Sequence, residues 1–408
     1  DLRGISGVRK TTGQHPGGLM IVPEYMDVHD FTPVQHPAND TKSSTLTTHF
    51  AYEVIHDDLV KIDALGHDDP TFIKMLKDIT DVDPEKIPMD DVDTISIFSS
   101  VKALGLQMHE LGTDMGTLGI PEFGTGFVRG MLQETKPSTF AELVRISGLS
   151  HGTDVWLNNA RDLIVSKKAG LSEVIACRDD IMNYLIAKGM EPSEAFKIME
   201  RVRKGKGLAP EEEKAMRVLA VPEWFLNSCK KIKYLFPKAH AAAYVSMGYR
   251  VAYFKVHYPI AFYSTYFSIK GGEFDIDLCM SDINTIKKEI LRLRAEPERN
   301  AKDRSRETLL EVVLEMALRG FGFLHVDLMK SHPTRFEIEG KYLRIPFNSL
   351  QNMGDKAALS IAEERSRRNF SSVEDLMRRT SLNKTSIEML RKYGALRGLP
   401  EKEQITLF

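Results

Sequence analysis

The chain has 408 residues, which is enough for two or three domains that each bury a core of their own. Its hydrophobic share of 42% and charged share of 27% are ordinary for a globular protein, and no apolar run approaches the roughly 20 residues that a membrane-spanning helix requires. The three cysteines lie far apart, which excludes a disulfide framework and a CxxC zinc site and fits a reducing cytoplasm.

Charge is distributed unevenly along the chain, although the formal net charge is only −2. Residues 1–100 carry 8 Lys and Arg against 18 Asp and Glu, whereas residues 287–397 carry 23 against 16. An acidic first part suits divalent metal ions, and a basic last part suits a phosphate backbone. The ordinary alternative is a solvated charged surface.

A glycine pair lies between a polar stretch that begins at residue 7 and an apolar strand predicted over 19–22. Gly17 and Gly18 would let backbone N–H groups approach a triphosphate closely, and Arg9 and Lys10 would supply positive charge. A tight turn before a buried strand explains the same residues.

Asp63 lies at the end of a second predicted strand, 59–62, in which apolar and β-branched residues surround one lysine. A glycine turn follows, and then Asp69 and Pro70 suit the N-cap and first position of a helix predicted over 71–78. A carboxylate placed in this way can present a metal ligand. The alternative is that Asp63 only caps or hydrogen-bonds a turn.

Helical periodicity dominates residues 94–286. Helices are predicted over 139–146, 178–188, 192–202 and 211–219. Two stretches in this part, 124–129 and 145–154, combine glycines and hydroxyls with a histidine at a helix boundary. They could line a nucleotide pocket or form capped turns between helices.

A third stretch, residues 234–244, places Lys238 and His240 near the start of a helix that is rich in alanine. A helix N-terminus favours anions through its dipole and its free N–H groups. The alternative is a close contact between two helices, with His240 as a satisfied core histidine.

Residues 287–307 are predicted to form a charged helical bridge broken by Pro297, and residues 320–347 alternate like strands. A short helix, a turn and a second helix then follow over 345–362, in the pattern of a helix-hairpin-helix. Such a turn meets a phosphate through its backbone N–H groups without reading bases. Asn352 stands where the first hairpin glycine is expected, before Gly354 and Lys356, and asparagine tolerates the left-handed conformation that such a turn needs.

The last residues, Gln404 to Phe408, resemble the bacterial sliding-clamp binding peptide. Leu407 and Phe408 would fill an apolar pocket, and Gln404 would hydrogen-bond at its edge. A frayed terminus is the default for such a segment.

The order of these motifs resembles the C-family bacterial replicative DNA polymerases. An arginine precedes His-x-Gly-Gly and an apolar strand, and about forty residues later Val-Lys-Ile-Asp-x-Leu-Gly follows. Pro16 and the stretch 67–70 are similar to the PolC type of α subunit, and the resemblance runs from about Gly4 to Phe408. It implies the C-terminal part of a larger protein, which a start without methionine also suits.

This resemblance implies a multidomain, mostly α fold with an α+β palm remnant. The implied domains are the end of the palm (1–93), all-α fingers (94–286), a duplex-binding domain (287–400) with the helix-hairpin-helix over about 345–400, and a clamp-binding tail (401–408). The implied activity is template-directed transfer of deoxynucleotides to a primer 3′ end by two Mg²⁺ ions. The implied partners are primer-template DNA, deoxynucleoside triphosphates, the sliding clamp and other replisome subunits, without a membrane.

The resemblance also implies roles for single residues. Asp63 is implied as a catalytic carboxylate and metal ligand, and Arg9, with the loop from His15 to Gly18, as a holder of the triphosphate. Lys238 and His240 would assist them, and Ser147 and Phe236 would border the base pair.

One departure from the family pattern concerns the other two palm carboxylates, an Asp-x-Asp expected upstream of Asp63. The Asp-x-Asp spacings present here, at 81–83, 91–93 and 275–277, lie downstream. We therefore expect the 408-residue chain alone to be inactive. The rival hypothesis is a non-catalytic module that binds duplex DNA and the clamp. A metallohydrolase is disfavoured because the histidines show no HExxH or other compact ligand spacing.

Overall fold

In the computed structural model, residues 13, 18–62, 66–107 and 110–402 are described. The chain divides into two compact units, Asp1–Asp68 and Asp69–Phe408. This division into compact units does not test the limits of the predicted palm, fingers and duplex-binding domains, which remain a prediction.

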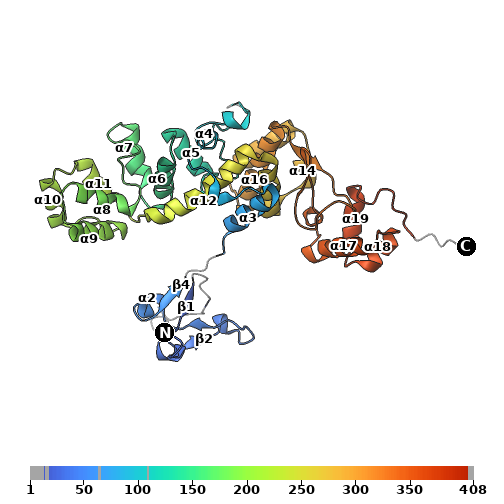
Figure 1. Ribbon diagram of the computed structural model, residues 1–408, viewed down its shortest axis with the longest axis horizontal. Helices are drawn as coiled ribbons and strands as arrows, with labels where there is room; N and C mark the ends of the chain where they lie inside the picture. The colour runs from blue at the N-terminus through green and yellow to red at the C-terminus, as the bar shows by residue number, and fades with distance from the viewer. Residues whose placement is uncertain (1–12, 14–17, 63–65, 108–109, 403–408) are drawn as a thin grey trace, which may run out of the picture. The chain divides into compact units, whose positions relative to one another are not determined.

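The first unit contains four short strands in two separate pairs (Figure 1). Its elements are β1 (Leu19–Ile21), η1 (Val28–Asp30), β2 (Val34–Gln35), η2 (Pro37–Asn39), β3 (Thr47–Thr48), α2 (Tyr52–Ile55) and β4 (Val60–Ile62). Strands β1 and β4 pair antiparallel, as do β2 and β3. The two strands predicted at 19–22 and 59–62 are thus confirmed and are neighbours in one ladder.

Helices make up most of the second unit, as the apolar spacing predicts. Its first part contains α3 (Asp68–Thr80), η3 (Pro84–Lys86), α4 (Val92–Ser96), η4 (Lys102–Leu104), α5 (Gly126–Thr135), α6 (Phe140–His151), η5 (Trp156–Ala160) and α7 (Arg161–Val165). The next part contains α8 (Arg178–Ala187), α9 (Pro192–Arg203), α10 (Pro210–Val218), α11 (Glu223–Lys231), α12 (Lys238–His257) and α13 (Pro259–Lys270). Helix α3 begins one residue before the predicted N-cap, so Asp69 is buried in its first turn and the capping prediction is wrong.

The remaining elements follow the predicted order of bridge, strands and paired helices. They are η6 (Gly271–Glu273), α14 (Ile276–Cys279), α15 (Ile283–Ala295), α16 (Ala301–Leu318), β5 (Gly322–Leu324), β6 (Glu337–Glu339), β7 (Tyr342–Arg344), η7 (Phe347–Ser349), α17 (Asp355–Arg367), α18 (Val373–Arg379) and α19 (Lys384–Lys392). The charged bridge breaks between α15 and α16, around Pro297. The strands form a three-stranded sheet in the order β5-β7-β6, with β5 parallel and β6 antiparallel to β7.

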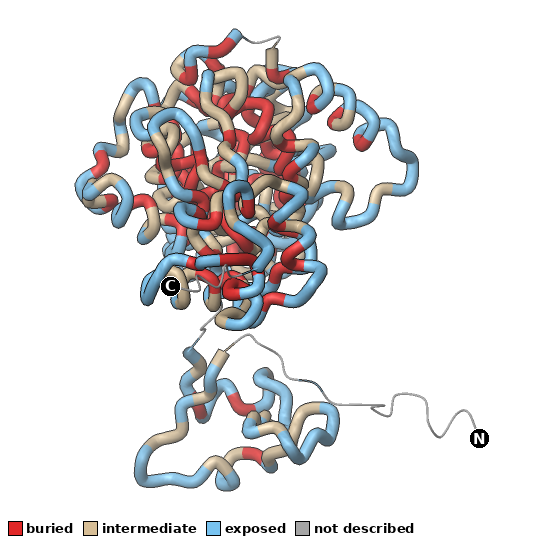
Figure 2. The backbone as a smooth tube through the Cα atoms, turned by 90° about the vertical axis from the view of Figure 1, so that its right-hand side faces the viewer, coloured by how far each residue is buried: buried red, intermediate tan, exposed pale blue. Residues whose placement is uncertain are grey.

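Buried residues run through the helices of the second unit (Figure 2). Helix α12 is central to it, because α12 packs against α4, α6 and α13. Lys255, near the end of α12, is fully buried and donates to the carbonyls of Gly116 and Leu118 and to the carboxylate of Glu315 on α16, at 2.8, 2.6 and 2.8 Å. Three acceptors match the three N–H bonds of an ammonium group, so this buried charge is fully hydrogen-bonded. No helix of the described chain is long and apolar enough to cross a membrane.

Candidate functional site

The structure describes about half of the predicted site residues. Gly18, Ser147, Phe236, Lys238, His240, Asn352, Gly354 and Lys356 are described. Outside the described residues lie Arg9, Lys10, His15, Gly17 and Asp63, and at the other end Gln404, Leu407 and Phe408.

Gly18 belongs to the first unit and directly precedes β1. Leu19, the next residue, pairs with Ile62 at the end of β4. The antiparallel register thus brings the residue after the glycine pair opposite the residue before Asp63.

Ser147, Phe236 and His240 lie together in the second unit, and His151 is the residue that links them. Its ring stacks on Phe236, with 4.9 Å between centroids and 21° between planes. His240 in turn meets the Phe236 ring edge to face, with 4.7 Å between centroids. The Ser147 carbonyl lies 2.8 Å from Nδ1 of His151.

The two ring nitrogens of His151 both face acceptors. Nδ1 faces the Ser147 carbonyl, and Nε2 lies 3.0 Å from the Glu122 carboxylate. A carbonyl and a carboxylate cannot donate, so this geometry favours the doubly protonated ring. The Glu122 carboxylate accordingly raises the pKa of His151, although partial burial opposes it.

His151 is the histidine of the stretch 145–154, for which the sequence predicts no separate role, and nothing in the sequence indicates Glu122. Glu122 lies 29 residues upstream in a loop, with a left-handed backbone (φ 68°) and a side chain only 14% exposed. No periodicity or motif marks this residue, because its contact with His151 depends on the tertiary fold.

The Ser147 hydroxyl is too deeply buried to contact a base pair directly. Ser147 is 2% exposed, and its Oγ has no hydrogen-bond partner among the described residues. The next residue, Gly148, leaves no room for a side chain, since a Cβ there would lie 2.4 Å from Sγ of Cys177. A ligand that reaches the Ser147 hydroxyl therefore needs a local opening of this packing.

Carboxylates already occupy the start of α12. The backbone N–H of Lys238 donates to Asp179 at 2.8 Å, and the Lys238 ammonium lies 3.8 Å from Asp180. The side chains of Lys238 and His240 are nonetheless exposed, so both remain accessible to an anionic ligand. A phosphate here would have to compete with Asp179 for the first N–H group.

The stretches 124–129 and 145–154 show the capped turns that were the alternative to a nucleotide pocket. Thr125 caps α5 by accepting from the Val128 N–H, and Nη2 of Arg129 donates to both carboxylate oxygens of Glu311 in a largely buried ion pair. The second stretch supplies His151 and Ser147 to the cluster above.

The hairpin turn adopts the conformation expected of it. Asn352 is left-handed, with φ 63°, and Gly354 is the extended N-cap of α17. The side chain of Lys356 is exposed in the first turn of α17. The replacement of the first hairpin glycine by asparagine is therefore compatible with the turn.

The downstream Asp-x-Asp pairs have a structural explanation. Asp83, Asp91 and Asp275 cap η3, α4 and α14 by accepting from backbone N–H groups. Within the described residues, no three His, Cys, Asp or Glu side chains come together in a group that could hold a metal ion.

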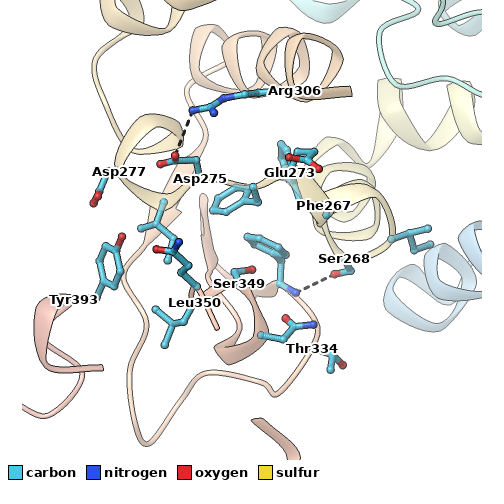
Figure 3. A pocket seen from close by; sticks show the side chains of 18 of the residues that line it. Phe267, Ser268, Glu273, Asp275, Asp277, Arg306, Thr334, Ser349, Leu350 and Tyr393 are labelled. Carbon is cyan, nitrogen blue, oxygen red and sulfur yellow. Dashed lines mark hydrogen bonds and ion pairs between the residues drawn. The ribbon is translucent and has the colours of Figure 1, made fainter. Parts of the chain in front are cut away.

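A cavity of about 500 Å³ lies away from these residues, where α13, η6 and α14 meet α16, η7 and α19 (Figure 3). Every second residue from 273 to 277 is acidic and pairs with a basic residue of α16 or α19 that also lines the cavity. The pairs are Glu273 with Lys302, Asp275 with Arg306, and Asp277 with Lys392. Because these charges compensate one another, the cavity is a seam between helices rather than a site that selects an ion.

Family models match three parts of the chain. Residues 2–66 match the bacterial DNA polymerase III alpha NTPase domain, residues 69–221 the bacterial DNA polymerase III alpha subunit finger domain, and residues 320–405 the helix-hairpin-helix motif. The first two define the class as the bacterial DNA polymerase III alpha subunit, and the mostly helical multidomain fold agrees with it.

Individual relatives narrow this class. The chain is 64% identical over 404 residues to DNA polymerase III PolC-type of Thermotoga petrophila and of Thermotoga maritima, and 52% identical over 408 residues to that of Bacillus subtilis. These matches cover 99–100% of the chain but only 28–30% of each relative. The chain belongs to the PolC-type DNA polymerase III family.

Proposed function

We propose that this protein acts in template-directed DNA synthesis, as a DNA-directed DNA polymerase. The observation that carries the proposal is the 64% identity to PolC-type relatives over 99% of the chain. The chain spans less than a third of those relatives, so it would supply only some of the parts that the reaction needs.

In this proposal, α12 and its neighbours border the incoming nucleotide. Phe236 and His240 would face the base pair, and Lys238 would neutralise phosphate charge. The ring contacts of Phe236 with His151 and His240, beside the exposed Lys238, support this role, since aromatic rings and a cation suit a stacked base and a triphosphate. Ser147 would contact the nucleotide after the local opening described above, and Arg9, Lys10, His15, Gly17 and Gly18 would hold the triphosphate.

Two Mg²⁺ ions would supply the chemistry, by activating the primer hydroxyl and stabilising the leaving pyrophosphate. Asp63 is the carboxylate proposed to hold them, but it lies outside the described residues, which offer no metal-binding group of their own. Binding of the two ions would require Asp63 together with the Asp-x-Asp carboxylates that the family has upstream of it, which this chain does not carry. We therefore propose that the 408-residue chain alone does not extend a primer.

The last part of the chain would bind the duplex without reading sequence. The left-handed turn at Asn352 and the N-cap at Gly354 present backbone N–H groups, and Lys356 adds charge beside them. Neutralisation of about five phosphates predicts a log–log slope of affinity against salt of about −4.5. Fluorescence anisotropy with two blunt duplexes of unrelated sequence tests this; a slope near zero, or strong preference for one duplex, would contradict it.

The C-terminal tail is proposed to bind the sliding clamp through Gln404, Leu407 and Phe408, in a cytoplasmic replisome at the nucleoid. Each of the two apolar side chains contributes roughly 1.5–3 kcal/mol when buried. Leu407→Ala with Phe408→Ala should therefore weaken binding to a bacterial clamp by more than about a hundredfold. Calorimetry that finds the same affinity for the wild type and the double variant would refute the assignment.

A further inference from the structure

A strip of basic residues lies on α9, α11 and the loops that follow them, in the helices that Figure 1 draws in green. Residues 201–206 carry Arg201, Arg203, Lys204 and Lys206, and residues 230–233 carry three further lysines. Neither segment contains an acidic residue. We call these two segments the basic strip.

The fold places the two segments in direct contact. Gly205 is left-handed, with φ 70°, and ends α9; a Cβ on it would lie only 2.5 Å from the carbonyl oxygen of Lys233. The N–H of Lys206 donates to the Arg201 carbonyl at 3.1 Å, which fixes the loop against the helix end. The strip is therefore a defined surface and not a pair of unrelated loops.

The positive charge of the basic strip is only partly compensated. Arg203 and Lys204 share Glu200, Arg201 pairs with Glu212, and Lys230 pairs with Glu213. Three carboxylates thus face seven cations. Lys231 donates to a backbone carbonyl instead, and Lys206 and Lys233 are exposed to solvent. Cations near the C-terminal ends of α9 and α11 also stabilise these helices through their dipoles. That structural role accounts for only some of the seven cations.

The strip leads directly to the proposed nucleotide site. Lys233 and Tyr234 are held against Thr153, with N–H···O bonds of 3.0 Å in each direction. Two residues, Tyr234 and Leu235, lie between Lys233 and Phe236, so the two positions are at most about 10 Å apart along the chain. Tyr234 is 40% exposed, so the surface offers an aromatic ring between the lysines and Phe236.

We propose that the basic strip, with Tyr234, binds the backbone and bases of single-stranded DNA that runs toward Phe236. Cations along a backbone combined with an exposed aromatic ring are what single-strand binding requires. A paired base hides both of its faces, so Tyr234 can stack only on an unpaired one. The direction toward Phe236 rests on the proposed function, whereas the binding itself does not.

The test measures affinity for labelled oligothymidylate and for a blunt duplex between 50 and 200 mM NaCl, on the full chain. Substitution of three lysines, Lys204→Gln, Lys206→Gln and Lys233→Gln, should reduce the single-strand salt slope by about 2 and the affinity roughly 10- to 100-fold. Affinity for the duplex should remain. Tyr234→Ala should weaken single-strand binding about 5- to 100-fold with the salt slope unchanged.

Controls separate charge, folding and the proposed function. The three lysines changed to arginine should retain binding, and a matched triple variant at Lys77, Lys86 and Lys102 should behave as the wild type. If the glutamine triple variant does not fold, Lys206→Gln and Lys233→Gln singly should each reduce the slope by about 0.7.

Unchanged oligothymidylate binding in folded strip variants would overturn the inference. The inference would also be overturned if these lysines bound poly-glutamate, an acidic polypeptide, and did not bind oligothymidylate. Failure of the wild type to bind the blunt duplex would instead contradict the proposed function and leave the single-strand result to stand alone.

Discussion

Replacement of Lys255 by methionine tests the buried junction between α12 and α16. Methionine keeps most of the side-chain volume but removes the donors to Gly116, Leu118 and Glu315, which are all within 2.8 Å. Lys255 and Glu315 are both fully buried, so the variant leaves a carboxylate without its counter-charge. Breaking such a pair costs roughly 3–5 kcal/mol.

The chain has more than one compact unit, so a single free energy of unfolding is not a suitable measure. Amide hydrogen exchange of α12, α13 and α16 reports local opening instead. A cost of this size should accelerate exchange there by roughly 10²- to 10⁴-fold. Lys288→Met, on the exposed side of α15, is the matched control and should leave exchange unchanged.

Glu315 provides a second test of the same pair. Changing Glu315 to glutamine in the Lys255→Met background removes the unpaired charge and should recover part of the loss. Two results would contradict this explanation of the junction. One is exchange in Lys255→Met as slow as in the wild type, and the other is exchange in the double variant as fast as in Lys255→Met.

Burial lowers the pKa of Lys255 to about 8, while Glu315 opposes the shift. Unfolded lysine binds its proton up to about pH 10.4. The unfolded state therefore holds more protons between these values, and the free energy of local opening should rise from about pH 8 toward pH 10. The Lys255→Met variant should lack this rise.

Two further variants probe the candidate site. Glu122→Gln should return the pKa of His151 toward its ordinary value, and NMR titration of the ring in both proteins measures this. The raised pKa of the wild type stabilises the fold fully below pH 6.5, and this contribution is lost as pH rises through the raised pKa. Gly148→Ala should lower the free energy of local opening of α6 by roughly 1–3 kcal/mol, because its Cβ would lie 2.4 Å from Sγ of Cys177. Gly130→Ala should raise that of α5 by about 0.5–1 kcal/mol, because no atom lies within 4 Å of the added Cβ. Amide hydrogen exchange of α5 and α6 that neither variant changes would contradict this packing.

Local signals in the sequence were sufficient for most helices and strands. Thr139 caps α6 through a capping box with Glu142, and Pro192 occupies the first turn of α9, so both helices begin where the spacing predicts. The hairpin turn was also predictable, since asparagine at position 352 permits the left-handed conformation that the structure shows.

Contacts between distant residues were not predictable from the sequence. Nothing in the sequence near Glu122 or Asp179 indicates that Glu122 approaches His151 or that Asp179 accepts from the Lys238 N–H. The first contact depends on how a loop packs, and the second on how the start of α8 packs against the start of α12. The basic strip likewise depends on the tertiary fold, because residues 201–206 and 230–233 are separated in the sequence and are brought together where Gly205 approaches Lys233.

The role of Asp63 is the central claim, and primer extension tests it most directly. The measurement uses the longer protein, with this chain and the remaining length that its relatives have, in the presence of Mg²⁺ and all four nucleotides. Asp63→Asn should remove most of the extension, and Asp58→Asn, in the exposed turn before β4, should leave it near the wild-type level. Full extension by the Asp63→Asn protein would show that the active site lies elsewhere.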